Sequence, residues 1–141
     1  MAENRTTLQM LGSVELFKDL SDKELEQIVA EAKEVDFQPG HSIVTEGQSG
    51  IGFHLILDGE ARVTQGGREL SRLRPGDYFG EISLIDGGPR SATVSADSAV
   101  RALSLVSWNF LPLVERTPSI ASKLLIRMCK RLRDAEESLT H

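Results

Sequence analysis

Residues 79–94 read FGEISLIDGGPRSATV, and this stretch differs in character from the segments on either side of it. Gly80 precedes about one helical turn, residues 81–84, which interrupts a series of short β-prone segments. The start of a helix presents unpaired backbone amides and the positive end of the helix dipole. A glycine at that point lets a ligand approach the backbone closely. The stretch therefore predicts an anion-binding site.

Two charged residues, Arg90 and Glu81, determine the chemistry of this predicted site. Arg90 follows a Gly-Gly-Pro turn and, together with the Ser91 hydroxyl, can hold a phosphate through parallel charged hydrogen bonds. Glu81 would repel a phosphate, so a sugar hydroxyl is its natural partner. Each residue also has a plainer interpretation, because a first-turn Glu stabilises the helix dipole and a turn Arg is commonly solvated. The residues alone leave both interpretations open.

Short β-prone segments alternate with turn signals on both sides of this stretch, from residue 35 to residue 106. Close, regular spacing of short strands favours an antiparallel roll over a parallel sheet. We expect strands at residues 42–45, 52–57, 61–65, 69–73, 91–96 and 100–105. The predicted fold class is α+β, mainly β: an antiparallel β-roll, or double-stranded jelly roll, with helices at both ends.

The flanking segments are predicted to be helical. Residues 14–34 form the N-terminal helical segment, where Ser21 and Glu24 make a capping box before a helix over about 22–33. Residues 1–13 are expected to be a loose tail. Residues 107–141 form the C-terminal helices, and Thr117-Pro118 starts the last of them. Together, residues 1–141 are expected to make a single domain.

Composition restricts the function classes. The chain has 141 residues and a formal net charge of −5, which gives no general attraction for nucleic acid. The single cysteine, Cys129, excludes an internal disulfide, and His41, His54 and His141 are too dispersed to suggest a metal site. No leader or long apolar run signals export or membrane insertion, so we expect a cytoplasmic protein without a metal or cofactor.

The stretch 79–94 resembles the phosphate-binding cassette of cyclic nucleotide-binding domains, the modules of bacterial catabolite activators, protein kinase A regulatory subunits and cyclic nucleotide-gated channels. The family pattern is an aromatic or apolar residue, Gly-Glu, a short helical turn, then Arg-small-Ala before a strand. The likeness extends to Pro39-Gly40, Glu46-Gly47, FHLILDGE at 53–60 and RPGDYFGE at 74–81. It covers roughly residues 14–139.

The resemblance implies a role for each residue of the cassette and its surroundings. Glu81 would bind the ribose 2′-hydroxyl, and Arg90 would pair with the cyclic phosphate. The remaining ligand-binding residues implied by the family are those of the phosphate cage, of the base side of the roll and of the base cap: Gly80, Ile82, Ser83, Ser91 and Ala92; Val63, Leu70 and Ser71; and Arg131 and Leu132.

We therefore expect a regulatory sensor that binds a cyclic nucleotide, with cyclic AMP as the expected ligand, moves its last helix as a lid, and has no catalytic residues. The alternatives are a cyclic GMP-preferring sensor, a β-roll protein-interaction module that binds no nucleotide, and a β-roll enzyme, which the missing His cluster opposes. Because the sequence ends at His141, no DNA-binding segment is expected in this chain. The chain would then be a stand-alone domain or one cut from a larger protein. The C-terminal helix could pair two chains into a homodimer, and the effector protein is unknown.

Overall fold

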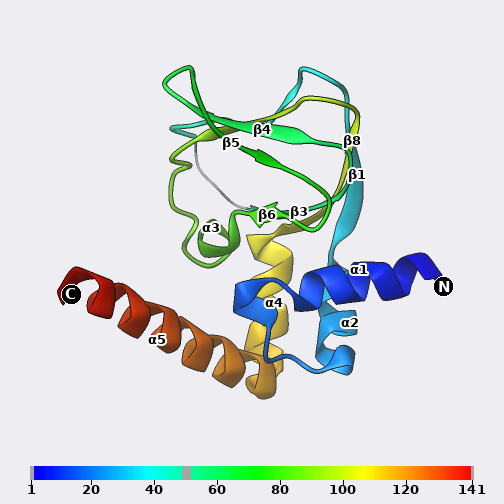
Figure 1. Ribbon diagram of the computed structural model, residues 1–141. Coiled ribbons are helices and arrows are strands. Elements are labelled where there is room, and N and C mark those ends of the chain that lie inside the picture. Colours follow the sequence, from blue (N-terminus) through cyan, green and yellow to red (C-terminus); the bar gives the residue numbers. More distant parts are fainter. Residues whose placement is uncertain (1, 49–51, 141) are drawn as a thin grey trace.

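Two four-stranded sheets form the body of the structure, a computed structural model that describes residues 2–48 and 52–140. One sheet has the order β1 (Lys33–Phe37), β8 (Val100–Val106), β3 (Gly52–Asp58) and β6 (Tyr78–Phe79). The other has the order β2 (Ser42–Val44), β7 (Thr93–Ala96), β4 (Ala61–Gln65) and β5 (Arg68–Leu73). Neighbouring strands run antiparallel. The predicted β-roll with helices at both ends is confirmed (Figure 1).

Two strands, β1 and β6, lie outside the six segments expected from the sequence. Strand β1 pairs with β8 along its whole length, from Lys33 opposite Ser104 to Phe37 opposite Val100. Strand β6 has two residues, which pair with His54 and Leu55 of β3. Strand β6 is too short to show a period-two pattern in the sequence. Strand β1 is polar and lies at the edge of its sheet, so its sequence has few strand-favouring residues. Both strands form because they pair with a strand that is distant in the sequence.

The N-terminal region is more ordered than the sequence suggests. The expectation of a loose tail over residues 1–13 is wrong for Ala2–Gly12, which form helix α1; Met1 lies outside the described residues. Leu11 of α1 is fully buried, so tertiary packing stabilises this helix despite its weak amphipathic pattern. A short 3-10 helix (Glu15–Phe17) and helix α2 (Asp22–Glu31) follow. The capping box of Ser21 and Glu24 is present as predicted.

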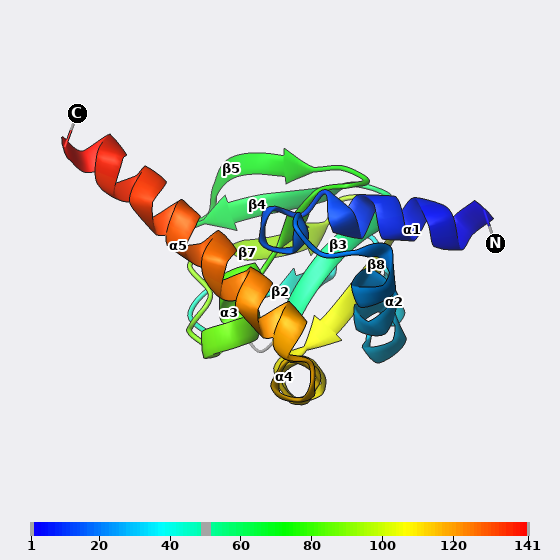
Figure 2. The ribbon, with the colours of Figure 1, turned by 90° about the horizontal axis from the view of Figure 1, so that it is seen from below.

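Strand β8 leads directly into two C-terminal helices, α4 (Ser107–Arg116) and α5 (Pro118–Thr140). Figures 1 and 2 show that α5 begins at the end of α4 and runs beneath the roll and past α3 (Glu81–Asp86), so that the C-terminal end lies on the opposite side of the molecule from the N-terminal end. His141 lies outside the described residues. In the described part of the chain, we find no helix with the length and apolar content needed to span a bilayer.

The main core lies where the N-terminal helices, the β3–β8 sheet and α4 meet. Phe17 packs edge-on against Phe53 at 5.6 Å between ring centroids and also contacts Phe110 at 6.0 Å. Ile120 and Leu124 bring the first turns of α5 into this core. A second cluster fills the roll between the sheets, around Ile56, Val94 and Ala102. Leu84 of α3 also belongs to the main core, which therefore fixes the position of α3 below the roll.

Candidate functional site

Gly80 joins the short strand β6 to helix α3 in a backbone conformation that favours glycine, with φ at 89°. A Cβ atom at this position would lie 2.4 Å from the Gly52 carbonyl oxygen and 2.4 Å from an Arg90 guanidinium nitrogen. Any side chain at residue 80 would therefore displace backbone and Arg90 together. This close approach explains why the sequence needs glycine where α3 begins.

A cavity of about 400 Å³ lies between α3, the turn at residues 89–92 and the inner faces of strands from the β2–β5 sheet. Its volume is within the range of small-ligand pockets. The lining residues are Val44, Val63, Leu73, Phe79, Gly80, Glu81, Ile82, Ser83, Pro89, Arg90, Ser91, Ala92 and Val94. The predicted residues of the phosphate cage therefore lie together on one cavity, opposite an apolar wall.

Arg90 is partly buried in this cavity, and its main chain is fixed by the loop after β2. The Arg90 amide donates to the Gln48 carbonyl at 2.9 Å, and the Arg90 carbonyl accepts from the Gly47 amide at 2.9 Å. One guanidinium nitrogen, Nη2, donates to the Gly52 carbonyl. The Nε atom is buried and has no hydrogen-bond partner among the described residues. An unsatisfied buried donor is costly, so an acceptor from a ligand fits this position.

Burial lowers the pKa of Arg90, and the nearby Glu81 carboxylate partly offsets this effect by raising it. Arginine nevertheless remains protonated, because its ordinary pKa is so high. The cavity therefore holds a partly desolvated cation, which attracts an anion more strongly than a fully solvated one.

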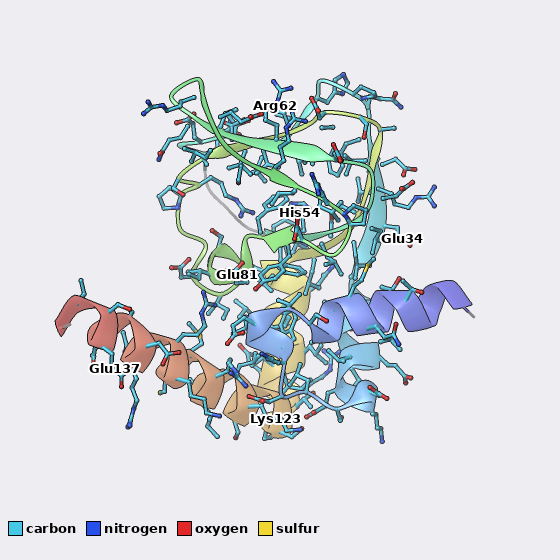
Figure 3. All side chains as sticks on the ribbon, in the orientation of Figure 1. Glu34, His54, Arg62, Glu81, Lys123 and Glu137 are labelled. Atoms are coloured by element: carbon cyan, nitrogen blue, oxygen red, sulfur yellow. The ribbon has the colours of Figure 1, made fainter. Side chains whose placement is uncertain are left out.

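Glu81 lies at the first position of α3 with 17% of its side chain exposed. Figure 3 shows it at α3, on the side of the roll nearest α5. Its Oε1 atom is 3.7 Å from the Arg131 Nη2 atom of α5, which is an ion pair at long range. Glu81 thus joins the cavity to the C-terminal helix, and its carboxylate can accept from a ligand hydroxyl.

The structure separates the predicted site residues into two groups. Val63 and all the predicted site residues of the cassette line the cavity, although the Ser83 hydroxyl also donates to the Gly88 carbonyl at 3.4 Å. Four predicted residues, Leu70, Ser71, Arg131 and Leu132, are not among the lining residues. In the pairing of β4 with β5, Ser71 is opposite Val63 but is exposed. Leu70 lies where the register between these two strands shifts, and it is 54% exposed. Leu132 is 61% exposed on α5.

Five lining residues are missing from the prediction: Val44, Leu73, Phe79, Pro89 and Val94. Alternation could have identified Leu73, which is two residues from Ser71 and therefore on the same face of β5. Val44 and Val94 are paired across β2 and β7, a pairing that the sequence alone does not show. These residues add to the apolar character of the wall that faces Arg90.

His54 is a partly buried histidine that lines a second pocket together with Gly52 and Arg90. Its Nδ1 atom is 2.7 Å from the Ser104 hydroxyl, and its ring stacks on Phe79 at 5.1 Å. Burial, and secondarily the charge of Arg90, lower the pKa of His54 from 6.5 to about 4. His54 is therefore a neutral packing residue at physiological pH.

Comparison with known proteins agrees with this geometry. The family model described as "Cyclic nucleotide-binding domain" matches residues 34–117. The chain is 40% identical over 104 residues to a cGMP-dependent protein kinase of Toxoplasma gondii, covering 74% of this chain and 10% of the kinase. It is 33% identical over 129 residues to the cyclic AMP receptor protein of Thermus thermophilus, covering 88% of this chain and 60% of the receptor.

A solved structure extends the likeness to the whole fold. The N-terminal domain of a transcriptional regulator from Streptomyces coelicolor superposes with a TM-score of 0.85 at 30% identity, covering 91% of this chain and 95% of that one. The chain spans from 10% to 61% of the length of the first curated relatives that it matches. The whole-protein activities of those relatives therefore do not transfer to it directly.

Proposed function

The chain belongs to the cyclic nucleotide-binding domain family, and we propose that its cavity binds a cyclic nucleotide, with cyclic AMP preferred over cyclic GMP. The observation that carries this proposal is Arg90, a partly desolvated cation whose buried Nε atom finds no hydrogen-bond partner within residues 2–48 and 52–140. Glu81 stands on the same cavity, opposite an apolar wall. A cyclic nucleotide offers these three surfaces an anion, a hydroxyl and an aromatic base.

In this pose, Arg90 holds the cyclic phosphate through its guanidinium group. The amides of Gly80, Ile82 and Ala92 and the Ser91 hydroxyl complete the phosphate cage, since the first amides of a helix are unpaired within it. Glu81 accepts from the ribose 2′-hydroxyl. The base lies along the strand side of the cavity, with Val63 on its wall.

The preference for cyclic AMP rests on the extent of the likeness to bacterial receptors. Ser91 does not decide the base, because in the family a serine after the cassette arginine accompanies both nucleotides. Relatives named for each nucleotide are present among the matches. The bacterial receptor matches over more of this chain than the cGMP-dependent kinase does, 88% against 74%. A preference for cyclic GMP of about tenfold or more, 1.4 kcal/mol, would overturn this choice alone.

Thermal melting tests this function against its rivals. A ligand that binds only the folded chain raises its melting temperature. We expect cyclic AMP to raise it and a divalent metal to have no effect. A chain that responds to neither cyclic nucleotide would be better explained as a protein-interaction module, and one stabilised by the metal as a β-roll enzyme.

The regulatory part of the proposal concerns helix α5, which acts as a lid in a sensor with no catalytic step of its own. Arg131 of α5 forms an ion pair with Glu81 of α3, which lines the cavity. On closure, Arg131 would stack on the base and Leu132 would pack against it. Leu70 and Ser71, which lie on the exposed strand β5, would become part of the covered site.

A second copy of the chain is the partner that best fits the exposed side of α5. Leu125, Leu132 and Leu139 recur at seven-residue intervals and are 67%, 61% and 87% exposed. Ala135 is exposed at the intermediate position between Leu132 and Leu139, whereas Met128, at the equivalent position one heptad earlier, is partly buried against the main core. We therefore propose a cytoplasmic homodimer that forms through α5. Sedimentation of the parent chain and of the Leu139→Glu variant tests this proposal: the parent should be a dimer and the variant should dimerise less. A monomeric parent would contradict it.

A further inference from the structure

Helix α5 has two parts with different surroundings. Its first three turns include Ile120 and Leu124, which are 0% and 5% exposed and belong to the main core. From residue 132 to residue 139 every side chain is exposed. A rigid helix that pivoted at its first residue would have to withdraw those buried residues from the core. Burial therefore holds the first turns of α5 in place, whereas residues 132–139 are not held in this way.

Glu24 of α2 fixes the first two turns of α5. This carboxylate is 7% exposed. Its Oε1 atom accepts from the Lys123 Nζ atom at 2.6 Å and from the Ser21 amide at 2.8 Å, and Oε2 accepts from the Ser119 hydroxyl at 2.7 Å. The same carboxylate therefore caps α2 and binds α5. Figure 3 shows Lys123 at this end of the helix, far from the roll.

Arg127 makes a second attachment one turn later. Its Nη2 and Nε atoms donate to the two oxygens of Asp19 at 2.7 and 3.0 Å. Its Nη1 atom donates to Glu15 Oε1 at 3.2 Å. Only 15% of the Arg127 side chain is exposed, and a two-pronged pair of this kind is geometrically specific. Asp19 and Glu15 belong to the N-terminal segment, as Glu24 does.

The distal part of α5 approaches the cavity at Arg131, whose Nη2 atom is 3.7 Å from the Oε1 atom of the lining residue Glu81. Arg131 is four residues, about one turn, after Arg127. Within one turn, α5 therefore contacts the N-terminal segment through Arg127 and the proposed ribose-binding residue, Glu81, through Arg131.

We propose that α5 works in two parts: residues 118–127 form a fixed arm clamped to the N-terminal segment, and residues 128–139 form the arm that responds to the ligand. The inference rests on the proposed function, because Glu81 must receive a ligand hydroxyl. A ribose at Glu81 competes with or repositions Arg131, and the change enters α5 at that turn. The clamps at Glu24 and Arg127 stop it from reaching the start of the helix.

Amide hydrogen exchange of the whole chain, with and without cyclic AMP, tests this division. In the parent, we expect ligand-induced protection at residues 80–93 and a ligand-dependent change at 128–139, with no change at 118–127. A change at 118–127 as large as that at 128–139 would overturn the two-part helix. So would protection at 80–93 with no change in either part of α5. No change anywhere, the cavity included, would reject the proposed function itself.

Variants of the clamp provide a second, independent readout. Glu24→Gln retains an acceptor but loses the charge that Lys123 contacts, and Arg127→Gln removes the second clamp without altering the buried Glu24. Because a charged hydrogen bond is worth about one decade in an equilibrium constant, exchange at 118–127 should rise about tenfold in either variant. The ligand-dependent change should then spread into 118–127. The control is Arg133→Gln, at an exposed position of the distal arm, which should leave 118–127 as in the parent. Equal exchange at 118–127 in the parent and both clamp variants would contradict the inference.

Discussion

Replacing Arg90 with alanine should abolish most of the affinity for a cyclic nucleotide while leaving the fold intact. The side chain is partly buried, Nη2 donates to the Gly52 carbonyl, and the buried Nε atom is left for the ligand. Removing one partner of a buried charge pair costs about 2–5 kcal/mol. At about 1.4 kcal/mol per decade, binding should weaken by roughly 30-fold to several thousandfold.

The same substitution should have little effect on stability. Alanine removes the hydrogen bond to Gly52 but also removes a cation whose pKa is lowered by burial, and these effects oppose each other. We expect the free energy of unfolding to change by no more than about 1 kcal/mol, the value of one ordinary hydrogen bond. A purely structural arginine would behave in the opposite way, with a loss of stability and unchanged affinity.

Calorimetric titration with cyclic AMP, paired with chemical unfolding, measures both quantities. Arg90→Lys keeps the charge but lacks the planar fork, so it should recover only part of the affinity. Arg68→Ala, at an exposed position of β5, is the matched control and should bind as the parent does. If Arg90→Ala binds cyclic AMP as tightly as the parent, Arg90 does not hold the phosphate and the reasoning fails.

Three further predictions concern Glu81, Gly80 and His54. Glu81→Gln keeps an acceptor and should lose less affinity than Glu81→Ala, and 2′-deoxy cyclic AMP should bind the parent poorly with little further loss in Glu81→Ala; additive losses would exclude a direct contact. Gly80→Ala places a Cβ atom 2.4 Å from the Gly52 carbonyl oxygen at φ of 89°, so both the melting temperature and the affinity should fall, and a parent-like variant would show that the backbone there adapts freely. Because the pKa of His54 is lowered from 6.5 to about 4, its neutral form stabilises the fold fully above about pH 6.5, and this contribution is lost as the pH falls to 4. The loss amounts to about 3 kcal/mol at most. His54→Gln should flatten the unfolding free energy over that range, whereas an unaltered pH slope would mean that His54 titrates normally.

The cassette could be predicted from the sequence because its chemistry is local. Gly80, Glu81 and Arg90 are close together in the chain, and the glycine and the short helix place them on one surface. The capping box at Ser21 and Glu24 was predictable for the same reason, because its two hydrogen bonds join residues three apart. Local spacing and the family resemblance were sufficient for these elements.

Other features depend on contacts between distant parts of the chain. Helix α1 was expected to be a tail, because its sequence has a weak apolar pattern and Leu11 is buried by partners far along the chain. The second function of Glu24, binding Ser119 and Lys123, joins residues 95 and 99 positions apart. The ion pair of Arg131 with Glu81 was not predicted, since it depends on the angle at which α5 leaves α4.

The most direct test of the central claim is calorimetric titration of the chain with cyclic AMP and, separately, with cyclic GMP. The account predicts saturable binding of one cyclic AMP molecule per chain, with cyclic GMP binding more weakly at the same site. The absence of saturable binding of either nucleotide would contradict it, because the cavity of Arg90 and Glu81 would then have some other ligand or none.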